Sequence, residues 1–422
     1  MLDIKVIRDN PDLVKQACAN KNDKADIDAI IALDNQRKAL LTESETLRAE
    51  QNKASQEIAK VKKTGGDATQ AIADMKNVST RISELNGKVR EVEEQLAAAM
   101  LRVPNIPDPD VPVGPDEEHN VTVREWGEKP AFAFKPAPHW ELGERLGILD
   151  LPKGAAVSGS GFYVLKGMGA KLERALISFM IDFHVREYNY TEIAPPFVCR
   201  SASMQGTGQL PKLEEDMYKL DNEDLYLIPT GEVPVTNLHR EEIMNAEDLP
   251  KYYCCYTPCF RREAGAAGKD TRGILRVHQF SKVEMVKIVK PETSEEEHQK
   301  LVGQAEKILQ MLNIPYRVRM LATGDLSFAA AKCYDIEIWS AGVENYLEVS
   351  SVSNFRDFQA RRMNCRFRDE NKKVQFVHTL NGSGTALPRL MIALLENNQT
   401  ENGEVTLPEV IRPYMGGLEK LS

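Results

Sequence analysis

A heptad repeat of apolar residues dominates residues 27–102 and restricts this segment to long packed helices. In the first half, apolar residues recur every seven positions, at Leu33, Leu40, Leu47, Ala54 and Val61. In the second half they alternate by three and four, at Met75, Val78, Ile82, Leu85, Val89, Val92, Leu96 and Ala99. This spacing is the a/d seam of a coiled coil.

The two halves are separated by Thr64-Gly65-Gly66-Asp67, which breaks a helix and turns the chain. A short turn between heptad helices predicts an antiparallel hairpin rather than a dimeric zipper. A first helix over residues 27–63 would be roughly 55 Å long at 1.5 Å per residue. We therefore expect an arm that projects from the body of the protein.

Composition excludes several classes of protein. At 422 residues the chain is longer than one typical core, and 42% apolar with 28% charged residues is ordinary for a globular protein. No signal peptide and no run long enough for a bilayer is present, so we expect a cytoplasmic protein with no membrane partner. The net charge of −9 argues against indiscriminate nucleic-acid binding but leaves room for a confined basic surface.

Cysteine usage indicates a reducing compartment. Seven cysteines, an odd number in a long chain, fit free thiols better than a disulfide framework. Cys254, Cys255 and Cys259 match no zinc spacing, so we expect buried thiols there.

A proline-rich run divides the chain. It begins at Val103-Pro104 and predicts a semi-rigid linker over residues 104–116, between an N-terminal domain (1–103, with the helical hairpin at about 27–102) and a domain over 117–422. In the latter, expected strands alternate irregularly with expected helices at 167–188 and 293–312. The expected strands cover residues 224–229, 317–321, 331–339, 346–351 and 374–379. We expect an α+β fold on a mainly antiparallel sheet flanked by helices.

Residues 260–285 concentrate positive charge around isolated acids and one phenylalanine. The basic residues, counted with one just beyond, are Arg261, Arg262, Lys269, Arg272, Arg276, His278, Lys282 and Lys287. A strand–loop–strand hairpin here could line a pocket with guanidiniums for phosphates. On charge alone, a solvated basic hairpin is an equal alternative.

Familiar nucleotide signatures are absent. Gly268-Lys269 lacks the P-loop glycine and is followed by Asp270, and Gly382-Ser383-Gly384 lacks the third glycine of a dinucleotide fingerprint. A nucleotide would therefore bind on a sheet surface.

Several segments together carry a resemblance that covers nearly the whole chain. Residues 260–285 resemble motif 2 of class II aminoacyl-tRNA synthetases, residues 171–198 (with Pro195 or Pro196) resemble motif 1, and residues 381–397 resemble motif 3. With Thr230-Gly231-Glu232, residues 348–351 and the helical hairpin, the pattern is similar to that of bacterial-type seryl-tRNA synthetases.

This resemblance implies ATP-dependent attachment of L-serine to tRNA(Ser) through a seryl-adenylate, with release of AMP and diphosphate, and also serylation of tRNA(Sec). ATP and Mg²⁺ are the implied cofactors, and motif 1 implies a homodimer. The implied catalytic residues are Arg261, Glu263, Arg276 and Arg389. The implied ATP-binding residues are Arg261, Arg262, Glu263, Arg276, Phe280, Glu348, Val349, Ser350, Ser351 and Arg389.

Within this set, Arg261 would bridge the α-phosphate and the serine carboxylate, Glu263 would accept from the adenine amine and Phe280 would stack on the base. Arg276 and Arg389 would hold the β- and γ-phosphates. Glu348 and Ser351 are the implied metal ligands, oxygen donors that suit a hard cation.

Serine recognition is implied for Thr230, Gly231, Glu232, Arg261, Glu284 and Ser383. Thr230 and Glu232 would bind the ammonium, and Glu284 and Ser383 the hydroxyl. The implied tRNA contacts near the tip of the arm are Lys53, Lys60, Lys62 and Lys63.

Two questions stay open from the sequence. The segment Thr230-Gly231-Glu232 could be only a strand end, whereas Glu284 in an apolar strand needs a buried partner. Simple alternation places Glu348 and Ser351 on opposite faces, so a bulge or twist is needed if both reach one metal.

Three departures from the family pattern are Arg262 in place of serine, Leu387-Pro388 before Arg389, and Asn189 in place of glycine, where asparagine suits a left-handed helix stop. Two alternatives remain: a ligase that loads an amino acid onto a carrier protein, and a coiled-coil scaffold with an inactive synthetase-like body. The helical hairpin speaks against the first and the intact residue set against the second.

Overall fold

The computed structural model describes residues 1–264 and 272–422, and these form two compact units. The helical unit comprises residues 2–19 and 23–104, and the sheet unit comprises Met1, residues 20–22 and 105–422. Lys269 of the basic segment lies outside the described residues. None of the helices in the described ranges combines the length and apolar character that a bilayer crossing requires.

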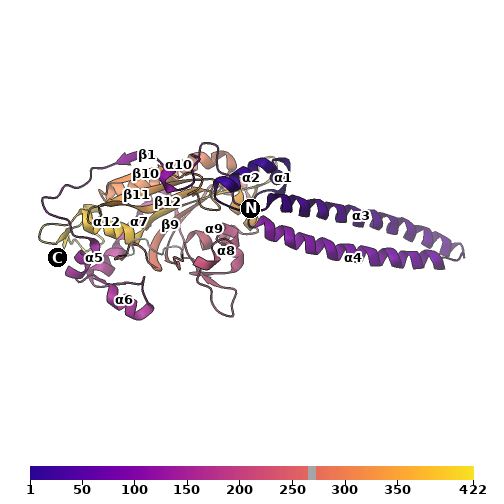
Figure 1. Ribbon diagram of the computed structural model, residues 1–422, viewed down its shortest axis with the longest axis horizontal. Coiled ribbons are helices and arrows are strands. Elements are labelled where there is room, and N and C mark those ends of the chain that lie inside the picture. Colours follow the sequence, from indigo (N-terminus) through magenta and orange to yellow (C-terminus); the bar gives the residue numbers. More distant parts are fainter. Residues whose placement is uncertain (265–271) are drawn as a thin grey trace. The chain divides into compact units, whose positions relative to one another are not determined.

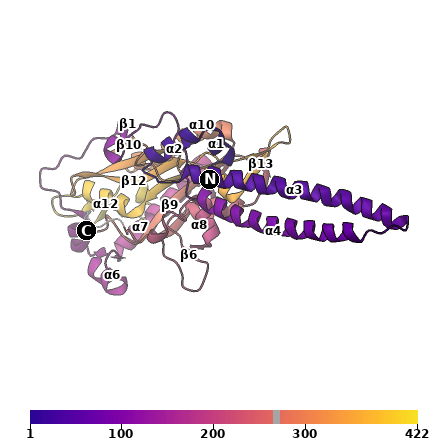
Figure 2. The ribbon, with the colours of Figure 1, turned by 45° about the vertical axis from the view of Figure 1, so that its right-hand side comes forward.

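The helical unit contains α1 (Ile4–Asp9), α2 (Pro11–Asn20) and two long helices, α3 (Ile27–Lys63) and α4 (Thr69–Met100). The long helices lie side by side along their length in both views (Figures 1 and 2), which confirms the expected antiparallel hairpin. α3 is capped at its start by Asp26, whose carboxylate accepts from the Ala29 amide, and at its end by Thr64, which precedes Gly65 at a φ of +75°. Ile82, Leu85, Val89 and Val92 of the seam are buried.

A buried carboxylate lies near the start of α3, which the heptad pattern did not predict. Asp34 is fully buried and pairs with Arg8 at 3.2 Å, Arg37 at 3.1 Å and Lys38 at 2.9 Å. Burial opposes ionisation of this carboxyl, but the hydrogen bonds from Lys38 and Arg37 outweigh it and lower the pKa of Asp34. The buried charge is thus compensated by three cations.

An eight-stranded sheet organises the sheet unit, in the order β1-β10-β11-β12-β15-β9-β8-β4. Every neighbouring pair is antiparallel except β4 and β8, which confirms the predicted fold class. The strand bounds are β1 (Val121–Trp126), β4 (Thr191–Glu192), β8 (Lys251–Phe260), β9 (Gln279–Val289), β10 (Tyr316–Met320), β11 (Lys332–Ser340), β12 (Asn345–Asn354) and β15 (His378–Ala386).

The two faces of this sheet differ. On one face, Val283 and Met285 of β9 join a large apolar core with α7 (Met168–Tyr188), α10 (Ser294–Met311) and α12 (Leu387–Asn397). On the other, Val286 packs on α9 (Glu232–Thr236), and α8 (Ser201–Thr207) and α11 (Phe358–Met363) lie nearby. Because side chains alternate along a strand, Glu284 belongs to this second face.

Smaller elements complete the sheet unit. The remaining α-helices are α5 (His139–Arg145) and α6 (Leu151–Ser158). The short strands are β2 (Leu149–Asp150), β3 (Val164–Leu165), β5 (Val198–Cys199), β6 (Tyr226–Leu227), β7 (Ile243–Asn245), β13 (Arg366–Arg368), β14 (Val374–Phe376), β16 (Val405–Thr406) and β17 (Lys420–Leu421). Single 3₁₀ turns are η1 (Glu117–His119), η2 (Glu214–Asp216), η3 (Asn237–His239), η4 (Ala246–Asp248), η5 (Pro291–Thr293) and η6 (Glu409–Ile411).

Of two local predictions, the helix end at Asn189 is confirmed and the strand over residues 374–379 is wrong. α7 ends at Asn189 in the left-handed region (φ 56°, ψ 34°), as expected for asparagine in place of glycine. The single strand expected over residues 374–379 is wrong: β14 pairs with β13, whereas β15 pairs with β9 and β12. The chain changes partner at Val377, which is buried in a separate apolar cluster.

The proline-rich segment bonds to the sheet unit. Asn105 donates to the carbonyls of Ala329 and Phe355, each at 2.9 Å, and Asp108 pairs with Arg356. Residues from 105 onward therefore share the sheet unit, while the division at 103 and 117 stays a prediction. All seven cysteines are free, as expected, and all are buried, which was expected of Cys254, Cys255 and Cys259.

Candidate functional site

A buried polar network surrounds Glu284 in the middle of β9. The carboxylate is fully buried and accepts hydrogen bonds from the Thr230 hydroxyl at 3.0 Å and the Asn381 amide at 2.9 Å. Lys282, two residues earlier on the same face, forms an ion pair with Glu284 and donates to Thr230 at 2.8 Å. Ser383 of β15 is paired in register with Glu284, so the two side chains share one face.

Glu232 forms the second carboxylate of this network. It lies at the start of α9, and its backbone amide donates to the Thr230 hydroxyl at 3.2 Å. Its carboxylate accepts from Gln359 at 2.6 Å, and Gln359 in turn accepts from Thr379 at 2.7 Å. Burial, reinforced by the negative charge of Glu284, raises the pKa of Glu232 to about 7.

Gly231 allows these groups to approach one another. A Cβ at this position would come within 2.8 Å of the Cys255 sulfur and 3.3 Å of the Glu284 Cβ. A side chain would therefore push the turn away from β8 and β9. The glycine between Thr230 and Glu232 has a packing reason that a strand end alone would not give it.

Arg261 follows β8 and borders the same network. Its Nε donates to the Pro229 carbonyl at 3.2 Å, directly before Thr230, and its guanidinium carbon lies 5.3 Å from the centre of the Phe280 ring. Its backbone amide donates to the His278 carbonyl at 2.9 Å, which holds the two ends of the hairpin together. Arg261 thus lies between the turn at Thr230 and the aromatic ring.

Glu263 and Arg276 face each other across the hairpin loop. Arg276 donates from Nη1 to the Glu263 carboxylate at 3.3 Å, and both side chains are about one quarter exposed, at 30% and 25%. Glu263 has a φ of +51°, an uncommon backbone conformation for a residue with a side chain. Arg262, between Arg261 and Glu263, has an exposed side chain.

Arg389 lies in the first turn of α12 and reaches two segments. It donates from Nη1 to the Glu348 backbone carbonyl at 2.7 Å and lies 3.5 Å from the Glu348 carboxylate. Its Nε lies 3.4 Å from the Leu275 carbonyl. Pro388, just before Arg389, is accommodated at the start of the helix.

A bulge in β12 places Glu348 and Ser351 on the same face of the sheet. Ser351 pairs with Asp335 and Ser350 with Ile336, but Glu348 pairs with Glu337, so Val349 is an extra residue. Asp335 and Glu337 share a face of β11, and their cross-strand partners share it too. Glu348 and Ser351 therefore lie on one face despite their spacing.

Asp335 adds a third oxygen donor on this face. Burial, together with the negative charge of Glu348, raises the pKa of Asp335 well above its ordinary value. The Ser351 hydroxyl also lies 3.1 Å from the Cys333 sulfur. Oxygen donors of this kind fit a hard divalent cation. Within residues 1–264 and 272–422, no three His, Cys, Asp or Glu residues are grouped to hold a metal by themselves.

Three residues of the site were missed in the sequence, namely Asn381, Gln359 and Asp335, and Lys282 was given no specific role. Alternation along the strand places Lys282 on the polar face with Glu284, but it does not predict their ion pair. Asn381 is two residues before Ser383 and shares its face. Gln359 lies on α11 and has no local signal, since its partners are far away in the sequence.

The lysines expected near the tip of the arm lie on α3. Lys60, Lys62 and Lys63 are in its last turn, and Lys53 is about two turns earlier. All four are exposed. Their role in binding RNA stays a prediction.

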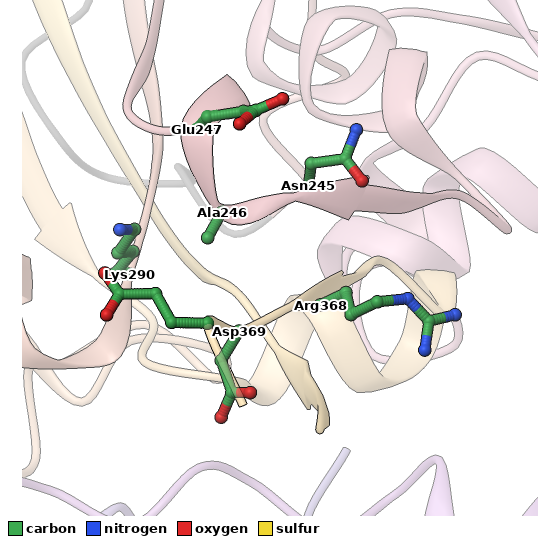
Figure 3. Close-up of a pocket in the computed structure, with 7 residues that line it drawn as sticks. Asn245, Ala246, Glu247, Lys290, Arg368 and Asp369 are labelled. Atoms are coloured by element: carbon green, nitrogen blue, oxygen red, sulfur yellow. The ribbon is translucent and has the colours of Figure 1, made fainter. Parts of the chain in front are cut away.

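A shallow hollow on the small sheet β14-β13-β7 contains none of the predicted site residues. Its lining residues are Asn245, Ala246, Glu247, Lys290, Arg368, Asp369 and Glu370 (Figure 3). Its lining contains both basic and acidic side chains, so its charge does not indicate one class of ligand.

Two family models match the chain. The tRNA synthetase class II core domain (G, H, P, S and T) matches residues 215–398, which include Thr230, the hairpin, β12 and α12. The seryl-tRNA synthetase N-terminal domain matches residues 1–107.

Curated relatives and solved structures are similar over their whole length. Serine–tRNA ligases from Carboxydothermus hydrogenoformans and Geobacter sulfurreducens are each 53% identical, over 99% and 100% of this chain and 98% and 100% of theirs. Seryl-tRNA synthetase from Pyrococcus horikoshii, complexed with ATP, has a TM-score of 0.95 and 41% identity over 100% of this chain and 99% of its own. Cytoplasmic serine–tRNA ligase from Naegleria fowleri, in complex with AMP, has a TM-score of 0.88 and 32% identity over the same shares. These matches confirm the resemblance that the motifs predicted.

Proposed function

The chain belongs to the seryl-tRNA synthetase family of class II aminoacyl-tRNA synthetases, and from this premise we propose how its residues divide the work. It is an enzyme that attaches serine to tRNA in an ATP-dependent reaction. We propose that the network around Glu284 binds serine, that the hairpin and Arg389 bind ATP, and that seryl-adenylate forms between them.

The observation that carries this proposal is the position of Arg261. Its guanidinium contacts the carbonyl before Thr230 on one side and the Phe280 ring on the other. A cation at this junction can bind the α-phosphate and the serine carboxylate together, and so offset the repulsion between the two anions that must react.

At the serine end, Glu284 and Ser383 would bind the hydroxyl, while Thr230, Gly231 and Glu232 would form the ammonium site. Glu284 already has three polar partners, so a substrate hydroxyl would join a prepared network rather than organise a new one. Alanine would bind without the hydrogen bond that the serine hydroxyl makes to Glu284, and this loss would discriminate against it.

At the ATP end, ligand binding would exchange the existing ion pairs. Arg276 would leave Glu263 for a phosphate, and Glu263 would then accept from the adenine amine while Phe280 stacks on the base. Arg389 would likewise leave Glu348 for a phosphate. Arg262, Val349 and Ser350 complete the expected ATP-binding set.

Glu348 and Ser351 would hold Mg²⁺, and Asp335, the cross-strand partner of Ser351, lies on the same face. Because the described residues do not group three strong ligands there, the cation would also need phosphate oxygens. Bound in this way, Mg²⁺ would neutralise charge on the phosphates as diphosphate departs.

Formation of the adenylate needs no general base. The serine carboxylate is already an anion at neutral pH, and its oxygen would attack the α-phosphorus while the bond to the diphosphate oxygen breaks. The terminal hydroxyl of tRNA would then attack the carbonyl carbon, its proton would pass to the phosphate of the departing AMP, and the bond between the carbonyl carbon and the AMP oxygen would break. Positioning and charge neutralisation would supply the rate enhancement.

Partners follow from the same premise. We propose that the exposed lysines of α3 contact tRNA(Ser) through its backbone and shape, that tRNA(Sec) is also serylated, and that the enzyme is a homodimer. A cytoplasmic location stays a prediction.

The test is serine-dependent exchange of pyrophosphate into ATP in the absence of tRNA. We expect exchange with serine, little with alanine or threonine, and its loss in Arg261→Ala. Lys251→Ala, at the opposite end of β8, is the matched control and should retain exchange. No exchange with serine in the unmodified enzyme would refute an adenylate route. Charging of tRNA(Ser) separates this function from loading of a carrier protein.

A further inference from the structure

A buried pair joins the start of α5 to the end of α12. The Nδ1 of His139 lies 2.8 Å from Glu396, and both side chains are fully buried. The same Glu396 oxygen accepts from the His139 backbone amide at 2.8 Å. The other oxygen accepts from the Ser340 hydroxyl and from the amides of Gly342 at 2.9 Å and Val343 at 3.3 Å. The Glu396 carboxylate thus accepts hydrogen bonds from two segments, His139 and residues 340–343.

The second nitrogen of His139 fixes the form of the ring. Nε2 lies 3.0 Å from the backbone amide of Ile274, which can only donate. Nε2 therefore carries no proton, and the proton of the neutral ring is on Nδ1, where it is donated to Glu396. One carboxylate orients the ring so that it presents an acceptor to the hairpin loop.

The loop is packed closely against this acceptor. Gly273 has a φ of +64°, and a Cβ there would lie 1.9 Å from the His139 Nε2. Ile274, Leu275 and Val277 are buried in one apolar cluster, whereas Arg276 between them is partly exposed and pairs with Glu263. The conformation that presents Arg276 thus depends on how the backbone of 273–275 is held.

One stripe of α12 holds this backbone at several points. Arg389, Ile392 and Glu396 recur at spacings of three and four, on one side of the helix. Arg389 contacts the Leu275 carbonyl, Ile392 joins the apolar cluster, and Glu396 acts through His139. If Arg389 moves to a phosphate, its contact with Leu275 weakens, but the one from His139 remains.

We propose that His139, oriented by Glu396, is a positioning residue for the ATP end of the site. It holds the Ile274 amide and so keeps Arg276 placed for a phosphate of ATP when Arg389 leaves Leu275. This inference rests on the proposed role of Arg276 in binding ATP.

Two substitutions distinguish the contact that Nδ1 of His139 makes with Glu396 from the contact that Nε2 makes with Ile274. In His139→Asn the amide can still donate to Glu396 from the Nδ1 position, but the acceptor for Ile274 is lost. In His139→Gln the amide oxygen reaches the Nε2 position and keeps that acceptor. We expect His139→Asn to raise KM for ATP about 10-fold in pyrophosphate exchange, as for the loss of one hydrogen bond. The KM for serine and kcat should change by less than about 2-fold, and His139→Gln should stay close to the unmodified enzyme.

Amide hydrogen exchange of residues 272–278 supplies a readout besides activity. Protection should be lost in His139→Asn and retained in His139→Gln. If His139→Asn does not fold, Gly273→Ala tests the same contact from the loop side and should raise KM for ATP alone. An unchanged KM for ATP, or equal rises for ATP and serine, would overturn the inference. Arg276→Ala in the same series distinguishes the two proposals: if it too leaves KM for ATP unchanged, the proposed role of Arg276 fails.

Discussion

The Thr230 hydroxyl donates to the Glu284 carboxylate across 3.0 Å, and this contact joins the turn before α9 to the middle of the central sheet. Both residues also contact Lys282, so a hydroxyl, a carboxylate and an ammonium share one buried site. Charged hydrogen bonds in such surroundings are stronger than in water. The charge of Glu284 is thereby stabilised before any substrate arrives.

Glu284→Ala should reduce kcat/KM for serine by about 10-fold to about 150-fold, because hydrogen bonds to a charged group contribute about 1.5–3 kcal/mol. The KM for ATP should change by less than about 3-fold, since Phe280 and Arg276 are untouched. Serine-dependent pyrophosphate exchange measures both. The variant also leaves the Lys282 ammonium buried without its carboxylate, so Lys282→Met combined with Glu284→Ala controls for lost stability. Equal losses for serine and ATP would contradict the assignment.

Glu232 should impose a pH dependence on serine use. Its pKa of about 7 means that the ionised form, which an ammonium requires, predominates only above neutral pH. We expect kcat/KM for serine to fall below about pH 7 and to level off above it. Glu232→Gln should be slower throughout and lack this limb. A profile unaltered by the substitution would exclude Glu232 as its source.

The same group should affect stability with the opposite sense. Its carboxyl has an ordinary pKa of 4.5, so between about pH 4.5 and 7 the folded protein binds this proton more tightly than the unfolded chain. The contribution of Glu232 to the free energy of unfolding is therefore present below pH 4.5 and is lost as the pH rises through 7, by about 3 kcal/mol. Denaturant unfolding of Glu232→Gln should show a smaller fall over this range.

Ser351→Ala should raise the Mg²⁺ concentration needed for half-maximal exchange by about 10-fold, because it removes one of few protein ligands. Ser353→Ala is the matched control, since Ser353 is the next residue on the same face and contacts the Cys333 sulfur at 3.3 Å. A titration of activity against Mg²⁺ compares them. Identical curves for both variants would remove Ser351 from the metal site.

Reversal of the lysine charges at the end of α3 should separate the two half-reactions. Lys60→Glu, Lys62→Glu and Lys63→Glu together should weaken tRNA(Ser) charging. The slope of log binding constant against log salt concentration should also become shallower, by the equivalent of up to about three phosphate contacts. Pyrophosphate exchange without tRNA is the internal control and should be unchanged. Loss of exchange to the same extent as charging would place the defect in the sheet unit instead.

The elements with a strong local pattern could be predicted from the sequence. The heptads and the breaker at residues 64–67 predicted the bounds of α3, and the apolar strand around Glu284 predicted that this carboxylate is buried with partners. The mainly antiparallel sheet followed from strands in irregular order. In each case, the signal lies within a few residues of the element that it predicts.

The remaining features depend on pairing between distant segments. The bulge at Val349 exists only relative to β11, so β12 alone could not reveal that Glu348 and Ser351 share a face. Gln359 enters the site through Glu232, and His139 meets Glu396 across 257 positions of sequence. Residues of this kind have no periodicity of their own, because their role comes from the fold.

The polar contacts inside the arm fix its length as well as its stability. A purely apolar heptad seam can slip by seven residues at little cost, because each layer resembles the next. Here Glu43 accepts from Arg81 at 2.7 and 3.1 Å, and Asn86 accepts from Ser44 at 3.3 Å and Arg48 at 3.1 Å. These pairs can form in one alignment of α3 with α4, so a slipped hairpin would lose them. The lysines at the end of α3 are therefore held at a fixed distance along the hairpin. An RNA that contacts them would have to fit this distance.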